Sequence, residues 1–208
     1  MIERVGRRIA SAFDRSVGSA GQADGEIGEA SPPPTVEFLA YGEDCLLVGR
    51  VRLDGVRITD LLNEHDEYEI RDLVAERLSD GHAAGVPALV VARHELLLVQ
   101  AVGPRGDATR RLRTSTYPVA AQVGPYRVRG QLHAMHGVDP EVVIHRRAPM
   151  VPLTEAWVDR PLGDERDLHR LGTVILNRDR MDWVVATWED SSRWLDDRPL
   201  TLEPTAAR

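Results

Sequence analysis

The chain of 208 residues contains no lysine, so all 26 of its basic residues are arginine. Together with the many Ala, Gly, Val, Asp and Leu residues, this bias is more typical of a GC-rich bacterial genome than of a surface selected for guanidinium groups. The net charge is -7. Such a charge disfavours nucleic acid as a partner of the whole molecule, because a polyanion attracts a positive surface. Any binding of nucleic acid would have to be local.

The chain also has only one cysteine, Cys45, which excludes an internal disulfide and a metal site built from several thiolates. A lone thiol is typical of the reducing cytoplasm, and we expect a cytoplasmic protein, with a peripheral position at the membrane as the alternative. No apolar run reaches the roughly 18 residues that a spanning helix needs. We therefore expect no transmembrane segment.

Local signatures of catalysis are missing as well. The sequence has no G-x-S-x-G, no H-E-x-x-H and no glycine-rich phosphate loop. His133 and His136 are three residues apart, which on a strand places their side chains on opposite faces, and no third ligand has diagnostic spacing. We expect no metal, no cofactor and no enzymatic activity. An enzyme whose groups assemble from distant positions is the less favoured alternative.

The amino-terminal segment, residues 1–17, is expected to form a short amphipathic helix. Apolar side chains recur there at helical spacing, with arginines on the other faces: Ile2, Val5, Ile9 and Phe13. We expect this helix to dock on its own domain or on a partner, and peripheral membrane contact through residues 1–17 is the alternative. Residues 18–34 then lose their hydrophobic side chains and include three consecutive prolines, which predicts a disordered linker.

The most informative feature that is present is a pattern that occurs twice. Val86–Val99 and Gly172–Val185 each hold two apolar runs on either side of an arginine, Arg93 or Arg178. The two arginines are 85 residues apart, and matching segments precede both copies in the same order at offsets of 83 and 81 residues. A shared order with small length differences indicates an internal duplication. We predict a mainly β protein of two similar small barrel-like units, preceded by the short amphipathic helix.

The repeat sets the expected organisation of the chain. The first unit spans residues 36–102, a basic connector spans 103–121, the second unit spans 122–187, and an acidic tail with tryptophans spans 188–208. Short apolar and β-branched segments predict the strands, with a helical turn at Thr59–Asn63 and a bulge within Tyr68–Leu78. The expected strands are Val36–Tyr41, Cys45–Leu53, Tyr68–Leu78, Ala88–Ala92 and Glu95–Ala101, then Tyr126–Ala134, Met150–Val158, Gly172–Asn177 and Met181–Ala186.

Two glycines occupy matching positions inside strands, Gly49 and Gly130. Glycine weakens a strand interior, so each predicts a bend or a close approach of another backbone.

In this order of elements each unit resembles the Sm-like and wider SH3-like small barrels. The bent strand Val48–Val51 and the turns Val91–His94 and Leu176–Asp179 carry the resemblance. The likeness implies the fold more than RNA binding, because His94 and Asp179 stand where the family has glycine. The whole arrangement is also similar to a bacterial family with no assigned activity.

The best candidate for binding is a basic span inside the acidic protein, between Arg105 and Arg147. Guanidinium groups suit phosphates and carboxylates, so an anion, nucleic acid or an acidic segment of a partner could bind there. Alternatively, these arginines pair with the acids of Glu64–Glu69 or of the tail and hold the two units together. The candidates are Arg105, Arg110, Arg111, Arg113, Arg127, Arg129, Arg146 and Arg147.

The sequence therefore favours a non-enzymatic binding or scaffold module of two packed small barrels. A protein partner or self-association is expected, and anion or nucleic-acid binding through the arginine-rich connector and second unit is the alternative.

Overall fold

The computed structural model describes residues 33–55, 57–103, 113–162 and 165–187. Within these ranges the protein is mainly β, and ten antiparallel strands form one sheet. The first half contains β1 (Thr35–Tyr41), β2 (Cys45–Arg52), α2 (Ile58–Glu64), β3 (Glu67–Arg77), β4 (Ala83–Ala92) and β5 (Leu98–Gln100). The second half contains β6 (Ser115–Val123), β7 (Tyr126–Ala134), α3 (Pro140–Arg146), β8 (Met150–Leu162), β9 (Glu165–Asn177) and β10 (Met181–Ala186). The expected helix 1–17 and tail 188–208 lie outside the described residues, as does most of the linker 18–34.

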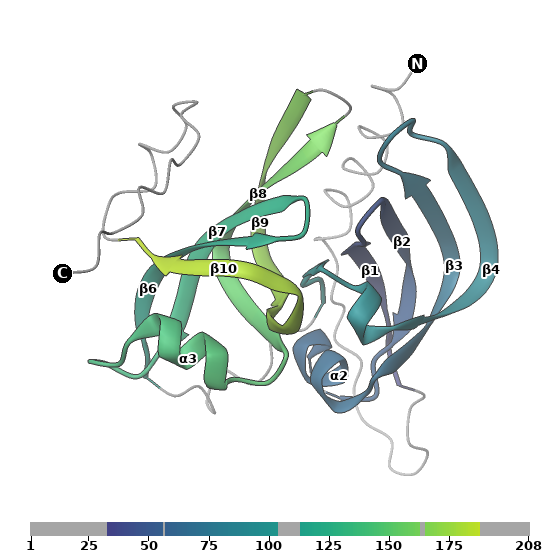
Figure 1. Ribbon diagram of the computed structural model, residues 1–208. Helices are drawn as coiled ribbons and strands as arrows, with labels where there is room; N and C mark the ends of the chain where they lie inside the picture. The colour runs from purple at the N-terminus through teal and green to yellow at the C-terminus, as the bar shows by residue number, and fades with distance from the viewer. Residues whose placement is uncertain (1–32, 56, 104–112, 163–164, 188–208) are drawn as a thin grey trace, which may run out of the picture.

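The two halves of the sheet have the same strand order. The sheet runs β10-β6-β7-β8-β9-β5-β1-β2-β3-β4, so the last strand of each half pairs with the first, and the others follow in chain order. Figure 1 shows the purple and blue strands of the first half beside the green and yellow strands of the second. The registers also match: Gly49 lies opposite Phe38, and Gly130 lies opposite Val119.

A bulge occurs at the same place in each half. The β2–β3 register shifts between Val48 and Arg50, and the β7–β8 register shifts between Arg129 and Gln131. The opposite strands contain Asp72 and Glu155, each with φ 50°. A left-handed backbone is uncommon for residues other than glycine, and here it lets the strand kink so that its apolar side chains change phase. The bulge expected within the Tyr68–Leu78 segment is confirmed.

The two glycines lie where neighbouring backbones approach closely. A Cβ atom at Gly49 would lie 2.6 Å from Ile70 Cγ2 and 2.7 Å from the Arg71 carbonyl oxygen. A Cβ atom at Gly130 would lie 2.9 Å from the Thr154 carbonyl oxygen. Each glycine therefore allows the middle strands of its half to pack together at the bulge.

Two apolar clusters form the core, and both contain side chains from the two halves. The first surrounds Phe38, Leu62 and Ile70 and also includes Met150 and Ile175 from the second half. The second surrounds residues of β7 and β8 and includes first-half side chains such as Tyr41, Leu97 and Leu98. Removal of this shared apolar surface from water holds the halves together.

The direct junction between the halves is a short ladder of β5 against β9. It pairs Leu98 with Leu176, Val99 with Ile175 and Gln100 with Val174.

One buried amide anchors this ladder at its end. Asn177 is 2% exposed, and its Nδ2 donates to the carbonyl oxygens of Arg93 and Leu96 at 3.0 and 2.9 Å. The amide thus joins the end of β9 to the 3-10 turn Arg93–Glu95 before β5.

Strand β6 begins at Ser115, inside the stretch 103–121 that the sequence predicts to be a connector. The sequence did not predict this strand, because its first residues are polar and Pro118 is unfavourable inside a strand. Pro118 is tolerated because its carbonyl accepts from Thr187 N at 2.8 Å, so the missing N–H also faces that side and costs no bond to β7. The first strand of the second half is therefore β6, and the expected Tyr126–Ala134 strand is its second.

Strands β8 and β9 also extend further than expected, through a stretch rich in charged residues. Their ladder continues past Val158 as far as Leu162 opposite Glu165. Ion pairs cross between the strands, from Arg160 to Asp167 at 3.0 Å and from Arg166 to Asp159 at 2.7 Å. Such cross-strand pairs stabilise a ribbon whose sequence looks like a loop.

Candidate interaction site

Strand β4 lies at one edge of the sheet, and in the described part of the chain it pairs only with β3. Figure 1 shows β4 as the outermost strand on the right. Every described side chain from 83 to 90 is exposed, including Val86 at 41%, Leu89 at 45% and Val90 at 60%. We call Val86–Ala92 the β4 edge. Long apolar edge strands of this kind are templates for pairing with another chain.

The hydrogen-bond pattern shows which backbone groups of the β4 edge face outward. Arg93 N donates to the Asp66 carbonyl oxygen at 2.7 Å, so Arg93 faces β3. Backbone groups alternate sides along an antiparallel strand, which turns those of Ala88, Val90 and Ala92 away from the sheet. The β4 edge thus combines outward N–H and C=O groups with apolar side chains.

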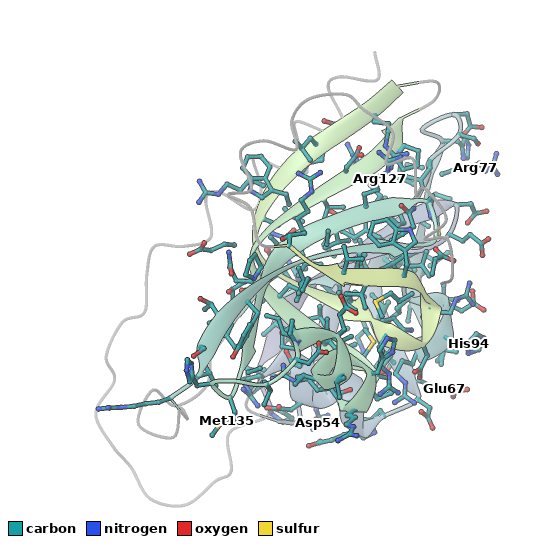
Figure 2. The ribbon with its side chains drawn as sticks, turned by 60° about the vertical axis from the view of Figure 1, so that its left-hand side comes forward. Asp54, Glu67, Arg77, His94, Arg127 and Met135 are labelled. Carbon is teal, nitrogen blue, oxygen red and sulfur yellow. The ribbon has the colours of Figure 1, made fainter. Side chains whose placement is uncertain are left out.

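Charged side chains border this apolar edge along β3. Arg71 pairs with Glu69 at 3.2 Å, and Arg77 pairs with Asp80 at 3.1 Å in the turn towards β4. Figure 2 labels Glu67 and Arg77, which mark the two ends of β3. An apolar strand with a charged rim is typical of a protein interaction surface.

Strand β10 forms the opposite edge of the sheet. Thr187 N donates to the Pro118 carbonyl oxygen at 2.8 Å, so by alternation Val184 and Ala186 face away from β6. Ala186 N donates instead to Glu141 Oε1 of α3 at 3.1 Å. Among the residues that the structure describes, β10 pairs only with β6, so its outer side has no strand partner.

The arginines of the predicted basic span do not gather in one place. Arg105, Arg110 and Arg111 lie outside the described residues. Arg127 lies near the start of β7, whereas Arg146 and Arg147 follow the other end of this strand, at the end of α3. Figure 2 labels Arg127, near the start of β7, in the upper part of the view and Met135, just after its end, in the lower part.

Three of the described arginines lie near one end of β7. Arg147 Nη2 donates to the His133 carbonyl oxygen, and Arg113 adjoins Thr114, whose hydroxyl lies 3.4 Å from His133 Nδ1. Arg146 and Arg147 line a hollow of about 390 Å³ beside α3. Burial lowers the pKa of Arg147 and that of Arg129.

Two of the acids that were expected to pair with these arginines bind other partners, and the acids of the tail lie outside the described residues. Asp66 pairs with Arg93 at 2.6 Å, and Glu69 pairs with Arg71. Both contacts lie inside the first half. The first joins the residue before β3 to the turn after β4, the second lies within β3, and neither crosses to the second half.

The repeat-turn arginines have matching structural contacts. Arg93 donates to the carbonyl oxygen of His65 at 3.3 Å, at the end of α2. Arg178 donates to the carbonyl oxygens of His145 at 2.9 Å and of Arg147, at the end of α3. A cation near a helix carboxyl end satisfies carbonyls that have no partner within the helix. Each arginine therefore ties its turn to the helix of the same half.

The histidine pair and the cysteine have ordinary surroundings. His133 Nε2 lies 2.8 Å from Thr154 Oγ1, and His136 Nδ1 lies 3.2 Å from Ser115 Oγ. Burial, and then the charge of Asp44, raise the pKa of the Cys45 thiol, which makes it a weaker nucleophile. In the described ranges no three His, Cys, Asp or Glu side chains are grouped as metal ligands, and no helix is long and apolar enough to cross a membrane.

The β4 edge was not predicted as a site, although the sequence drew attention to its residues. The apolar run after Val86 was interpreted as half of a repeat. The two copies of this run differ in one respect: strand β9 is covered by β5, whereas β4 is uncovered among the described residues.

Comparison with known proteins adds no relative, because no family model, no curated protein and no solved structure matches this chain.

Proposed function

We propose that this protein is a non-enzymatic interaction module and that it binds protein partners through the β4 edge. The observation that carries the proposal is the coincidence of outward backbone groups at Ala88, Val90 and Ala92 with the exposed side chains of Val86, Leu89 and Val90. An extended segment of a partner would add a strand beside β4. Main-chain hydrogen bonds would supply affinity, and the apolar side chains would supply selectivity.

The module consists, in this proposal, of one small barrel-like unit used twice. The common strand order, the matching bulges at Asp72 and Glu155, and the matching close approaches at Gly49 and Gly130 support a duplication. The same order of five strands with a helix after the second supports the resemblance to Sm-like and SH3-like barrels. In a duplicated unit, β4 and β9 are corresponding strands. The junction between the halves covers β9 with β5 and leaves β4 uncovered among the described residues.

A photo-reactive amino acid placed at Val90 of the full chain tests the binding proposal. We expect it to crosslink a protein in cell extract, whereas the same group at Met135 should not. Met135 is a matched control, because it is also 60% exposed but lies beyond the end of β7. Equal products from both positions, or none from Val90, would refute the β4 edge as the binding surface.

Anion or nucleic-acid binding is a second candidate. The hollow beside Arg146 and Arg147 favours it, because two guanidinium groups line one depression. Replacement of Arg146 by Ala should then weaken binding to a labelled oligonucleotide and reduce its dependence on salt. If neither changes, the second candidate fails.

The compartment and any membrane contact are proposals too. A free, half-buried Cys45 suits a reducing cytoplasm. Peripheral membrane contact would involve residues 1–17, which lie outside the described residues.

A further inference from the structure

The junction inside the chain indicates how the two outer edges of the sheet could be occupied. In that junction the last strand of the first half, β5, lies against the fourth strand of the second half, β9. The strands at matching positions are β10, the last of the second half, and β4, the fourth of the first half. These two strands are the outer edges of the sheet in the described structure. The sheet thus presents a second set of these two strand types: β10, which corresponds to β5, at one edge, and β4, which corresponds to β9, at the other.

We propose that a second copy of this chain occupies the β4 edge with its β10 strand, so that copies associate head to tail. This inference rests on the proposed function of the β4 edge and specifies the partner. Within the chain, Val99 lies opposite Ile175. The residues at the same offset of 85 positions are Val184 and Val90. The expected contact therefore places Val184 of one copy opposite Val90 of the next.

The backbone groups of the two edges are complementary in this register. Val90 and Val184 both direct their N–H and C=O groups away from the sheet, as deduced from the bonds at Arg93 and Thr187. An antiparallel pair that exchanges both of its hydrogen bonds requires this arrangement. A ladder of three residues, as in the internal junction, would use Trp183–Val185 and leave the contact between Ala186 and Glu141 in place.

The side chains also fit this contact. Leu89 and Val90 are 45% and 60% exposed, and the facing residues Trp183–Val185 are apolar and partly exposed. One feature of the internal junction has no match: Ala92 stands at the position of Asn177, so no buried amide would anchor the contact between copies. We therefore expect a reversible association that depends on concentration.

Because the two edges differ, the interface is heterologous, and the copy at each end of an open assembly keeps one unused edge to which a further copy can add. Sedimentation equilibrium of the full chain tests this directly. The wild-type protein should show an average mass that rises above the monomer with concentration. Val90→Pro and Val184→Pro each remove one outward N–H without breaking a bond to the inner neighbour, and each variant alone should remain a monomer.

The decisive sample is an equimolar mixture of the two proline variants. Val90→Pro retains a usable β10, and Val184→Pro retains a usable β4, so the mixture should form a heterodimer and nothing larger. A contact of β4 with β4 would instead leave the Val184→Pro protein dimeric by itself. That result, or a mixture that stays monomeric while both variants are folded by circular dichroism, would overturn the proposal.

A crosslinking measurement does not depend on disruptive variants. In a Cys45→Ser background, Val90→Cys and Val184→Cys proteins are mixed and oxidised. The mixture should give a covalent dimer, because residues paired across a ladder lie within disulfide range. Val90→Cys mixed with Val142→Cys is the control, since Val142 is exposed on α3. Equal yields in both mixtures would contradict the register.

Failure of this inference can be separated from failure of the proposed function. Met135→Lys should leave the association unchanged, whereas Val90→Lys should abolish it. A wild-type chain that is monomeric at every concentration, while Val90 still crosslinks a different protein, would overturn self-association and leave the β4 edge as a binding surface.

Discussion

At the scale of single residues, the fold depends on positions where only a small side chain fits. Gly49 and Gly130 each permit a close approach of the neighbouring strand, and both lie beside a bulge. Gly172 lies in β9 and has no atom within 4 Å of its hypothetical Cβ position. Substitution at Gly49 or Gly130 therefore tests whether the close packing requires glycine, and substitution at Gly172 measures the general cost of glycine in a strand.

Alanine at Gly49 or Gly130 should destabilise the protein. We expect each substitution to lower the free energy of unfolding by about 1–3 kcal/mol, because the added methyl group overlaps a neighbouring strand. Gly172→Ala should be neutral or slightly stabilising, since the site has room and the unfolded chain loses freedom. Urea denaturation of the three variants measures the difference. Equal stabilities would show that the close approaches are not required.

Stability should also fall in alkaline solution because of buried tyrosines. Burial is the main cause that raises the pKa of Tyr41 and of Tyr68 to about 12, from 10.0. The folded state holds these protons more tightly than the unfolded chain, so the tyrosines stabilise the fold below pH 10, and this stabilisation is lost as the pH rises towards 12. Urea midpoints across this range check the loss, and Tyr41→Phe should make the decline shallower. A flat profile would contradict the burial.

At the scale of elements, a buried amide anchors one end of the short junction of β5 with β9. Asn177→Ala leaves the carbonyl oxygens of Arg93 and Leu96 without their donor, and we expect it to lower the free energy of unfolding by about 1–3 kcal/mol. Gln122→Ala is the control, because that amide donates only to Gly124 in its own turn. Chemical denaturation compares the two. An Asn177→Ala protein as stable as the control would exclude the amide as an anchor.

Strands β1, β2 and β3 could be predicted closely from the sequence, because their apolar segments lie between clear turns. The other two differ: β4, expected from Ala88, begins at Ala83, and the expected strand Glu95–Ala101 is shortened to Leu98–Gln100 because Arg93–Glu95 form a 3-10 turn. Strand β1, expected at Val36–Tyr41, spans Thr35–Tyr41, and the bulge in β3 was visible as a slip in alternation. Strand β6 was missed because Pro118 is unfavourable in most strands. It is tolerated here because its missing N–H faces away from β7 and lies just past the end of the β10–β6 ladder, and local sequence does not reveal that arrangement.

The candidate site could not be predicted for the same physical reason. An apolar strand such as β4 has the same composition whether another strand covers it or not. Its exposure follows from the order of strands in the sheet, which depends on pairing between distant segments. The arginines were more visible in the sequence, yet the structure places Arg127 and Arg146 far apart along the chain's β7–α3 segment.

At the scale of the whole molecule, the sheet is continuous between two different outer edges. Each half shares core side chains with the other, so the two halves are joined by both packing and pairing. One junction is satisfied within the chain, and its counterpart strands are presented at the two ends. In our proposal, the exposed apolar edge of β4 is a surface on which another strand pairs.

Amide hydrogen exchange of β4 tests this central claim most directly. In dilute protein the outward N–H groups of Ala88, Val90 and Ala92 should exchange rapidly, while the inward N–H of Val91 is protected by β3. When the concentration of the full chain rises, or a bound partner is added, protection should appear at the outward amide of Val90 and leave Val91 unchanged. Exchange of Val90 that stays rapid under conditions where a complex has formed would contradict the account, because the complex would then use another surface.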